Sequence, residues 1–136
     1  MDKERLQGYR SKKDEIIELE WTLRHRWQDE GLIGNDVILD YRKGYPRPQG
    51  IVGFDYPRYD RLQDRDIERK ENLIHECEEV ENWVEAIPDS ITRRIFKMTF
   101  IQGRKQKEVA KSVNLDRSRI SRRIDKYLED KKDVRM

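Results

Sequence analysis

The sequence predicts an all-α fold in which long N-terminal helices precede a smaller helical unit at the C-terminus. Charged residues make up 43% of the chain and apolar residues 35%, a balance typical of exposed helices with narrow apolar stripes. These apolar residues recur at helical spacing in two long segments. Five of the seven glycines and three of the four prolines fall between those segments, at residues 31–59. The chain therefore predicts two helical regions separated by a non-helical connection.

The first predicted helix spans residues 3–30. Its apolar residues Ile16, Leu19, Leu23 and Trp27 are spaced by three, four and four positions, which places them on one face of a helix. The helix is expected to end before the first glycines of the next segment.

Residues 31–59 cannot carry a long helix, because glycine permits bends and proline lacks a backbone donor. We expect a short helix in NDVILDYRK, which begins at Asn35, and an extended loop with several tyrosines from Tyr45 onward. Two roles for this Gly/Pro/Tyr-rich loop are open. It is either a connector whose aromatic rings pack on the helices, or a loop that binds a partner.

The second predicted helix spans residues 60–87. A coiled-coil seam of about two heptads runs along it, formed by Leu73, Cys77, Val80, Val84 and Ile87. Two heptads are too few for stable pairing alone, so the seam should meet the first helix, a second copy of the chain, or both. We expect a homo-oligomer and favour a dimer. Cys77 is the only cysteine and is interpreted as a small buried apolar residue.

Residues 88–136 are predicted to form the C-terminal domain, and residues 1–87 the oligomerisation or partner region. Pro88 ends the second helix, and Asp89 or Ser90 can cap the next helix, over residues 90–101. That third helix is expected to turn Ile91, Ile95 and Met98 inward, and Gly103 to end it.

Two more helices are predicted at residues 106–113 and 117–129. Asn114 stands where the chain must turn sharply and tolerates the left-handed conformation, and Asp116 is placed to cap the second of these helices. Ala110 is small enough for a close helix crossing. A shared core is expected from Val109, Val113, Leu115, Ile120 and Ile124. This is the pattern of a helix-turn-helix supported by the third helix.

The net charge of +2 hides a strong asymmetry. Residues 89–136 hold 15 Lys and Arg against 7 Asp and Glu, whereas residues 1–88 hold 15 against 21. A basic C-terminal third indicates an anionic partner for that third alone, and double-stranded DNA fits the predicted motif. The start of the second motif helix enters the major groove in such a motif, and the preceding helix crosses the DNA backbone.

Candidate DNA contacts follow from this placement. Arginine can bond guanine with two hydrogen bonds, and serine can bond base edges. The expected base-contacting residues are Arg117, Ser118, Arg119, Ser121 and Arg122. Cations near the start of the first motif helix are candidates for phosphate contacts. The expected backbone-contacting residues are Arg104, Lys105, Gln106, Lys107 and Arg123.

The segment IPDSITRRIFKMTFIQGRKQKEVAKSVNLDRSRISRRIDKYLED, which begins at Ile87, resembles the C-terminal helix-turn-helix of bacterial sigma factors, region four. The resemblance is most specific in QKEVAKSVNLDRSRISRRI, where the glutamine, the Glu-apolar-Ala triplet, the turn and the Arg-Ser pair stand in phase. Asn114 occupies a position where glycine is commonest in that family. The layout of the whole chain also resembles the ArpU- and RinA-type phage late transcriptional regulators.

These resemblances imply a phage or prophage transcriptional regulator that acts at promoters in the cytoplasm of a bacterial host, with host RNA polymerase as a candidate partner. The segments that a complete sigma factor uses to grip polymerase and melt DNA have no counterpart here. Two alternatives stay open. One is a phage small terminase subunit, although such proteins commonly place the DNA-binding domain first. The other is an adaptor whose basic domain docks on an acidic protein.

An enzyme is not expected. His25 and His75 lack companions at metal-ligand spacing, and Asp64 and Asp66 diverge on a predicted helix. The chain has no phosphate-binding glycine loop and no nucleophile-base pair, so no cofactor or metal is expected. No apolar run approaches the roughly 18 residues that a membrane span needs.

Overall fold

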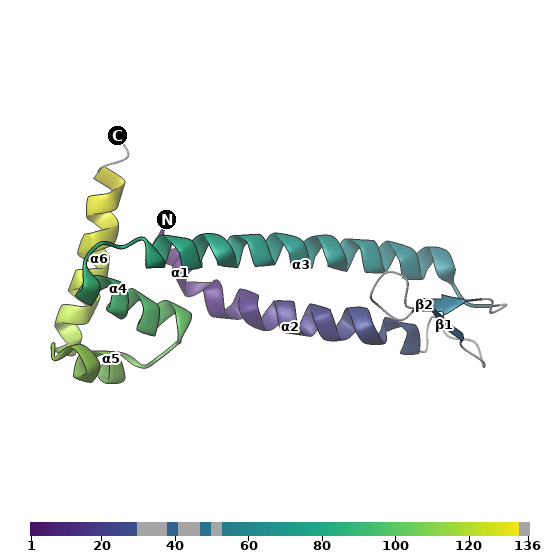
Figure 1. The fold of residues 1–136 in the computed structure, drawn as a ribbon, viewed down its shortest axis with the longest axis horizontal. Coiled ribbons are helices and arrows are strands. Elements are labelled where there is room, and N and C mark those ends of the chain that lie inside the picture. Colours follow the sequence, from purple (N-terminus) through teal and green to yellow (C-terminus); the bar gives the residue numbers. More distant parts are fainter. Residues whose placement is uncertain (30–37, 41–46, 50–52, 134–136) are drawn as a thin grey trace. The chain divides into compact units, whose positions relative to one another are not determined.

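The computed structural model describes residues 1–29, 38–40, 47–49 and 53–133, and these residues are predominantly helical (Figure 1). The predicted helical class is confirmed. No helix in the described ranges is both long enough and apolar enough to cross a membrane.

The chain divides into two compact units. Met1–Lys13 and His75–Met136 form one, called the terminal unit below, and Asp14–Ile74 form the other, called the central unit. The boundary predicted between residues 87 and 88 therefore falls inside the terminal unit. Its N-terminal residues contact the part of the chain that follows residue 74. The ion pair of Lys3 with Asp125 and the hydrogen bond of Arg10 with Ile101 belong to these contacts, and no local sequence pattern indicates them.

The N-terminal region forms α1 (Lys3–Gln7), α2 (Tyr9–His25) and a single 3-10 turn, η1 (Arg26–Gln28). The helix predicted over residues 3–30 is thus present with one interruption at Gly8, which caps α1. The predicted apolar face is confirmed. Ile16, Leu19 and Leu23 are buried, and Trp27 is half-buried.

The second long helix, α3, runs from Tyr56 to Glu85 and begins four residues before its predicted start. The side chain of Asp55 accepts a hydrogen bond of 3.1 Å from the backbone N–H of Arg58, which satisfies a first-turn donor. Pro57 is tolerated because the first turn of a helix needs no donor at that position. The sequence-based start was too late because the proline was treated as a helix breaker.

The predicted seam of α3 is occupied within the chain. In the terminal unit, Cys77, Val80, Val84 and Ile87 are buried, and the hydroxyl of Tyr9 on α2 donates a 2.9 Å hydrogen bond to Glu81 on α3. The first helix is therefore one partner of this seam. Burial raises the pKa of the Cys77 thiol above its usual value, in agreement with its interpretation as a small apolar residue.

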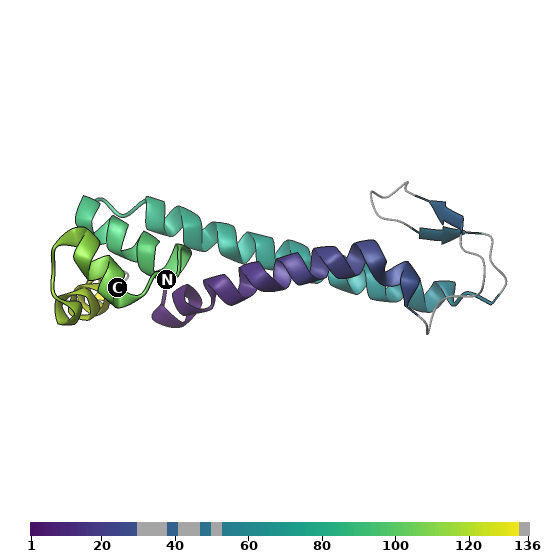
Figure 2. The same cartoon turned by 90° about the horizontal axis from the view of Figure 1, so that it is seen from below.

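Two short strands lie between α2 and α3 in the sequence. β1 (Ile38–Asp40) pairs antiparallel with β2 (Arg47–Gln49), with Leu39 opposite Pro48 (Figure 2). The short helix predicted from Asn35 is therefore wrong at residues 38–40, because a helix this short gains too few hydrogen bonds to offset its nucleation. The rest of that stretch, like Tyr45, lies outside the described residues.

The aromatic residues just before and within the first turn of α3 pack together in the central unit. Phe54 and Tyr59 are buried, and Trp27 and Tyr56 pack against them. The ring centroids of Phe54 and Tyr56 lie 4.8 Å apart in an edge-on arrangement. For residues 53–59 the connector interpretation is therefore the one observed.

The third predicted helix appears as α4 (Ser90–Phe96) followed by a π-helical turn, η2 (Lys97–Ile101). The side chain of Asp89 caps α4 by accepting from the backbone N–H and the hydroxyl of Thr92, at 2.9 and 2.7 Å. This cap sets the helix phase so that Thr92 and Ile95 face inward. Ile91 is 40% exposed, so its predicted inward position is wrong.

Candidate nucleic-acid interface

The last two helices are α5 (Gln106–Val113) and α6 (Arg117–Asp133), joined by a three-residue turn. Asn114 adopts the left-handed conformation, with φ 57° and ψ 43°, as predicted. The N–H of Leu115 donates a 3.0 Å bond to the carbonyl of Ala110, which closes a Schellman-type end to α5. The carbonyl of Asp116 then accepts the first hydrogen bonds of α6 from Arg119 and Ile120.

A core of buried apolar residues holds this pair of helices in place. α4 contacts both α5 and α6. The rings of Trp83, Phe96 and Tyr127 meet edge-on, with centroids 5.4 to 5.7 Å apart. The buried residues of α5 and α6 are Val109, Ala110, Val113, Ile120, Ile124 and Leu128. α6 therefore presents its other face from a well-packed support.

Four of the predicted base-contacting residues are exposed at the start of α6: Arg117, Ser118, Arg119 and Arg122. They lie away from the face that buries Ile120. No hydrogen bond or ion pair joins the side chain of any of them to another residue that the structure describes. Their donors are therefore available to a ligand.

The fifth residue, Ser121, is half-buried and has a partner inside the chain. Its hydroxyl accepts a 2.8 Å hydrogen bond from the side-chain amide of Gln106. Gln106 is itself one of the residues predicted to contact the DNA backbone. This bond ties the start of α5 to the first turns of α6. Both residues thus stabilise the spacing of the two helices before any ligand binds.

The remaining backbone-contacting candidates also fall into two groups. The side chains of Arg104, Lys105 and Lys107 are exposed around the start of α5 and have no partner among the described residues. Arg123 is instead held by α4. Its Nη2 lies 3.2 Å from Asp89, and its Nε donates to the Thr92 hydroxyl at 3.2 Å.

Asp89 therefore links the cap of α4 to α6. Hydrogen bonds from Thr92, and then from Arg123, hold the pKa of the Asp89 carboxyl below its usual value. The ionised carboxylate orients the guanidinium of Arg123 across the surface between the two helices.

A groove of about 440 Å³ opens beside α6 on this side. It is lined by Thr92, Leu115, Arg119, Arg122, Arg123, Lys126, Tyr127 and Asp130. Lys126 is exposed, and sequence reasoning did not select it. Its spacing of four residues from Arg122 and seven from Arg119 could have identified it, because all three share one helix face.

Three basic residues of α4 and η2 near this surface are used internally. On α4, Arg93 donates to the carbonyl of Ile87 at 2.8 Å, and Arg94 donates to the carbonyl of Ser112 at 3.2 Å. Lys97 forms an ion pair of 3.0 Å with Glu85. The basic charge of residues 89–136 is thus divided between structural contacts and the free cations of α5 and α6.

The N-terminal segment also braces this surface within the terminal unit. Arg10 on α2 donates a 3.2 Å hydrogen bond to the carbonyl of Ile101 and lies against Gly103, whose φ is +67°. A side chain at Gly103 would collide with that guanidinium as well as strain the backbone. Lys3 forms a 3.0 Å ion pair with Asp125 on α6.

Comparisons with known proteins add no assignment. No protein-family model matches the chain, and no match was found among the curated proteins or the solved structures. Among the described residues, no group of three or more His, Cys, Asp or Glu side chains is arranged to hold a metal ion. A functional proposal therefore depends on the geometry of α5, α6 and their support.

Proposed function

We propose that the chain is a sequence-specific, double-stranded DNA-binding transcriptional regulator that acts at promoters, with α5, the turn and α6 as its helix-turn-helix. One observation carries the proposal. Arg117, Arg119 and Arg122 stand exposed and unpaired, among the described residues, at the start of a helix whose opposite face is packed on a fixed support. Such a helix can enter the major groove without prior rearrangement.

Sequence would be read from the first turns of α6. An arginine there can donate two parallel hydrogen bonds to guanine O6 and N7, and Ser118 can bond either a donor or an acceptor on a base edge. Ser121 has one lone pair engaged by Gln106, yet its hydroxyl proton is still free to donate. Ser121 is therefore a weaker candidate for contacting base edges than the exposed arginines.

Register on the duplex would come from phosphate contacts on both sides of α6. Arg104, Lys105 and Lys107 flank the start of α5, where the free N–H groups of a helix terminus also favour phosphate. On the other side, the groove brings Lys126 beside the oriented Arg123. Each neutralised phosphate releases condensed counterions, so binding should weaken steeply as salt increases.

The similarity to region four of sigma factors motivates the promoter as the site and RNA polymerase as a candidate partner. The experiment that tests the proposal is selection of random DNA and of host-source fragments by the full chain at near-physiological salt, followed by sequencing. A recurring motif would support a sequence-specific regulator. Recovery without any motif would favour charge-driven binding, as in packaging or architectural proteins. Failure to recover DNA would refute the proposal and point to an acidic protein partner.

A further inference from the structure

The helix α2 carries a second apolar face that the described residues of the central unit leave largely exposed. Ile17 is 64% exposed and Trp21 is 62% exposed, whereas Ile16, Leu19 and Leu23 on the other side are buried. The two exposed residues are four apart, so they lie one above the other on the same helix face. A helix with apolar residues on two faces has one face for its own chain and another for a partner.

The exposed face is ordered before any partner arrives. The ring of His25 stacks on Trp21 with centroids 4.4 Å apart and an angle of 21° between the planes, and its Nδ1 lies 2.7 Å from the Trp21 carbonyl. Beside these rings, residues of α2, η1 and α3 line a groove of about 490 Å³ that includes Leu62 and Arg65. Association here would immobilise few additional rotatable bonds.

Charge identifies the partner. Along the exposed face, Asp14 lies one turn before Ile17, and Arg24 lies one turn after Trp21. Two cations near Asp14 are already used within the chain, since Lys13 pairs with Glu81 at 3.4 Å and Arg10 donates to the carbonyl of Ile101 at 3.2 Å. Among the described residues, the unpaired charges at the two ends of the face are therefore acidic at Asp14 and basic at Arg24, with Ile17 and Trp21 between them. Such a pattern is complementary to itself when the second helix runs in the opposite direction.

We infer that the chain forms a two-fold dimer through this face of α2, here called the Ile17–Trp21 stripe, with the two helices antiparallel. In that register Ile17 lies opposite Trp21 of the partner, and Asp14 lies opposite Arg24 of the partner. Each pair occurs twice because of the two-fold symmetry. A parallel arrangement would instead place Asp14 on Asp14 and Arg24 on Arg24, so like charges disfavour it.

The sequence left open whether the seam of α3 meets the first helix, a second copy of the chain, or both, and the inference places the contact between copies on α2 instead. In the terminal unit that seam is buried within the chain. The Ile17–Trp21 stripe is instead exposed on the surface of the central unit. Glu18 and Glu20 flank the stripe and would approach their own counterparts. The dissociation constant of the dimer is therefore expected to be high, so that dilution dissociates the dimer.

The test is sedimentation equilibrium of the full chain from about 1 µM to about 1 mM, a range that spans weak protein association. We expect a monomer–dimer equilibrium that Trp21→Ala weakens at least tenfold and Ile17→Ala weakens to a lesser degree. Ile91→Ala is the matched control, because Ile91 is an exposed large apolar residue of α4 outside the stripe. A monomer at all concentrations, or an oligomer insensitive to Trp21→Ala, would overturn the inference.

The register is tested by charge reversal. Asp14→Arg and Arg24→Asp should each weaken the dimer, and the chain carrying both changes should recover the original dissociation constant, because every pair is restored with its signs exchanged. Circular dichroism confirms that each variant is folded. Failure of the double variant to recover would refute the antiparallel arrangement. The dissociation constant of the dimer is measured without DNA. The result therefore tests the dimer independently of the proposed DNA-binding function.

Discussion

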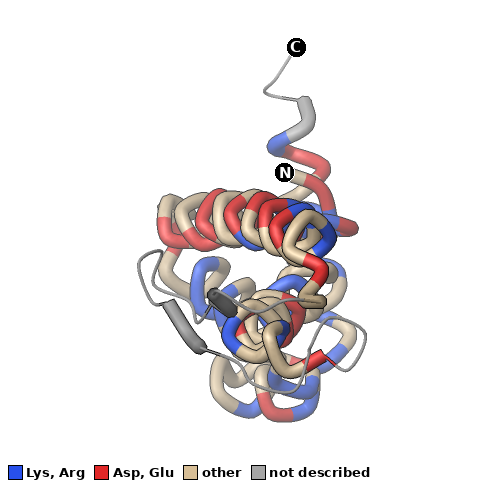
Figure 3. The backbone as a smooth tube through the Cα atoms, turned by 90° about the vertical axis from the view of Figure 1, so that its right-hand side faces the viewer, with Lys and Arg blue, Asp and Glu red and all other residues tan. Residues whose placement is uncertain are grey.

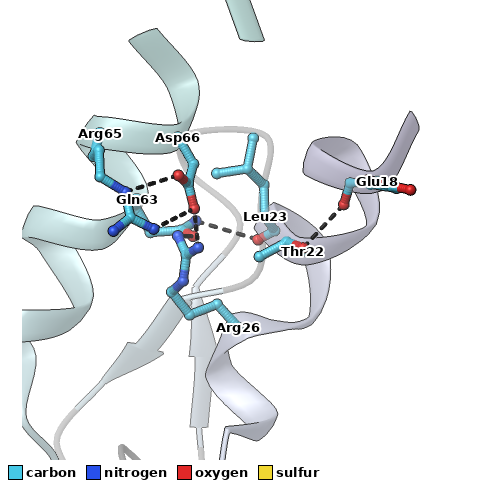
Figure 4. Close-up of polar contacts among 7 residues, drawn as sticks. All are labelled: Glu18, Thr22, Leu23, Arg26, Gln63, Arg65 and Asp66. Carbon is cyan, nitrogen blue, oxygen red and sulfur yellow. Dashed lines mark hydrogen bonds and ion pairs between the residues drawn. The ribbon is translucent and has the colours of Figure 1, made fainter. Parts of the chain in front are cut away.

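Arginine has opposite roles in two regions of this molecule. In the central unit, Arg26 is buried, with a side chain only 6% exposed, and it bonds Asp66 and the side-chain oxygen of Gln63 (Figure 4). In the terminal unit, Arg119 and Arg122 on α6 are exposed and have no partner among the described residues. The number of cations alone therefore does not locate a binding site. We place the proposed site where cations lack internal acceptors.

The acidic residues that supply those acceptors are concentrated on α3. This helix holds ten Asp and Glu against five Lys and Arg, and red is prominent along it in Figure 3. Inside the terminal unit, its carboxylates pair with the N-terminal cations. Arg5 lies 2.5 Å from Glu79, and Lys12 lies 3.1 Å from Glu76. These exposed pairs contribute little stability each but leave few free cations on α1 and α2.

The largest effect is expected on the free energy of unfolding, when buried Arg26 loses its partner Asp66. Asp66→Ala leaves the Arg26 guanidinium buried beside Gln63 alone, and loss of one partner from a buried ion pair costs about 3–5 kcal/mol. Thermal or urea unfolding measures it. Asp64→Ala, an exposed neighbour on α3, is the control and should change stability little. Equal losses of unfolding free energy in the two variants would mean that the buried Arg26–Asp66 pair stabilises the fold no more than an exposed carboxylate does.

The same carboxylate predicts an acid dependence of stability. Burial alone would raise the pKa of Asp66, but hydrogen bonds from Arg65 and Arg26 and their charges outweigh it, so the pKa lies below its usual value. The stabilisation is therefore complete above the unfolded-state pKa of about 3.9 and is lost as pH falls through the lower folded-state pKa. The stability difference between the native chain and Asp66→Asn should shrink below about pH 4. A difference that stays constant would contradict this assignment.

The next largest effect is expected on DNA affinity, from a substitution that should leave the free energy of unfolding unchanged. Arg119→Ala removes an exposed, unpaired donor from α6, so specific binding should weaken by about 1–3 kcal/mol and the preference at one base should relax. Titration of the selected site and of single-base variants measures both. Arg61→Ala, an exposed cation of the central unit, is the control. If all sequences lose affinity equally, Arg119 contacts phosphate only.

A smaller effect is expected at the turn between α5 and α6. Alanine at position 114 would keep the left-handed conformation without the local hydrogen bonding of asparagine, at a loss of about 1 kcal/mol in unfolding free energy. Asn114→Gly should be close to neutral, since glycine adopts this conformation without strain. Denaturant unfolding of the two variants gives the comparison. A glycine variant as unstable as the alanine variant would show that the asparagine side chain matters more than φ.

The smallest effect is expected from one phosphate contact. Lys105→Ala should weaken binding to all sequences alike and lower the salt slope of the binding constant by about one unit. Lys97→Ala is the matched control, because Lys97 is exposed but paired with Glu85. A slope that does not change would remove Lys105 from the contact set. Lys126→Ala tests the groove beside α6 in the same way.

The helices were predictable because their signals are local. The caps and turn at Asp89 and Asn114, together with the apolar spacing of the first helix and of α6, were each visible within about one turn of chain. The start of α3 and the position of Ile91 were misjudged. In both cases an aspartate side chain accepts a hydrogen bond from a backbone N–H of the first turn and so sets the helix start or phase, which apolar spacing does not record.

The candidate site was only partly predictable for the same reason. Charge and spacing around the start of α5 and along α6 selected ten residues. They could not separate Arg119, whose side chain is free, from Arg123, which is held by Asp89 and Thr92 thirty or more positions away in the chain. Gln106 and Ser121 are likewise joined across two helices. Pairing between distant residues depends on how helices pack, and single-sequence periodicity carries no information about it.

The sequence by itself determined the helical class, the helix ends near Pro88 and Gly103, the left-handed turn at Asn114 and the basic character of the C-terminal third. These depend on backbone preferences and on charges that act within a few residues. Only the tertiary structure decided which carboxylates neutralise which cations, that Met1–Lys13 joins the terminal unit, and that Trp21 stays exposed. Those outcomes depend on contacts between residues far apart in the chain, which form only when the helices pack.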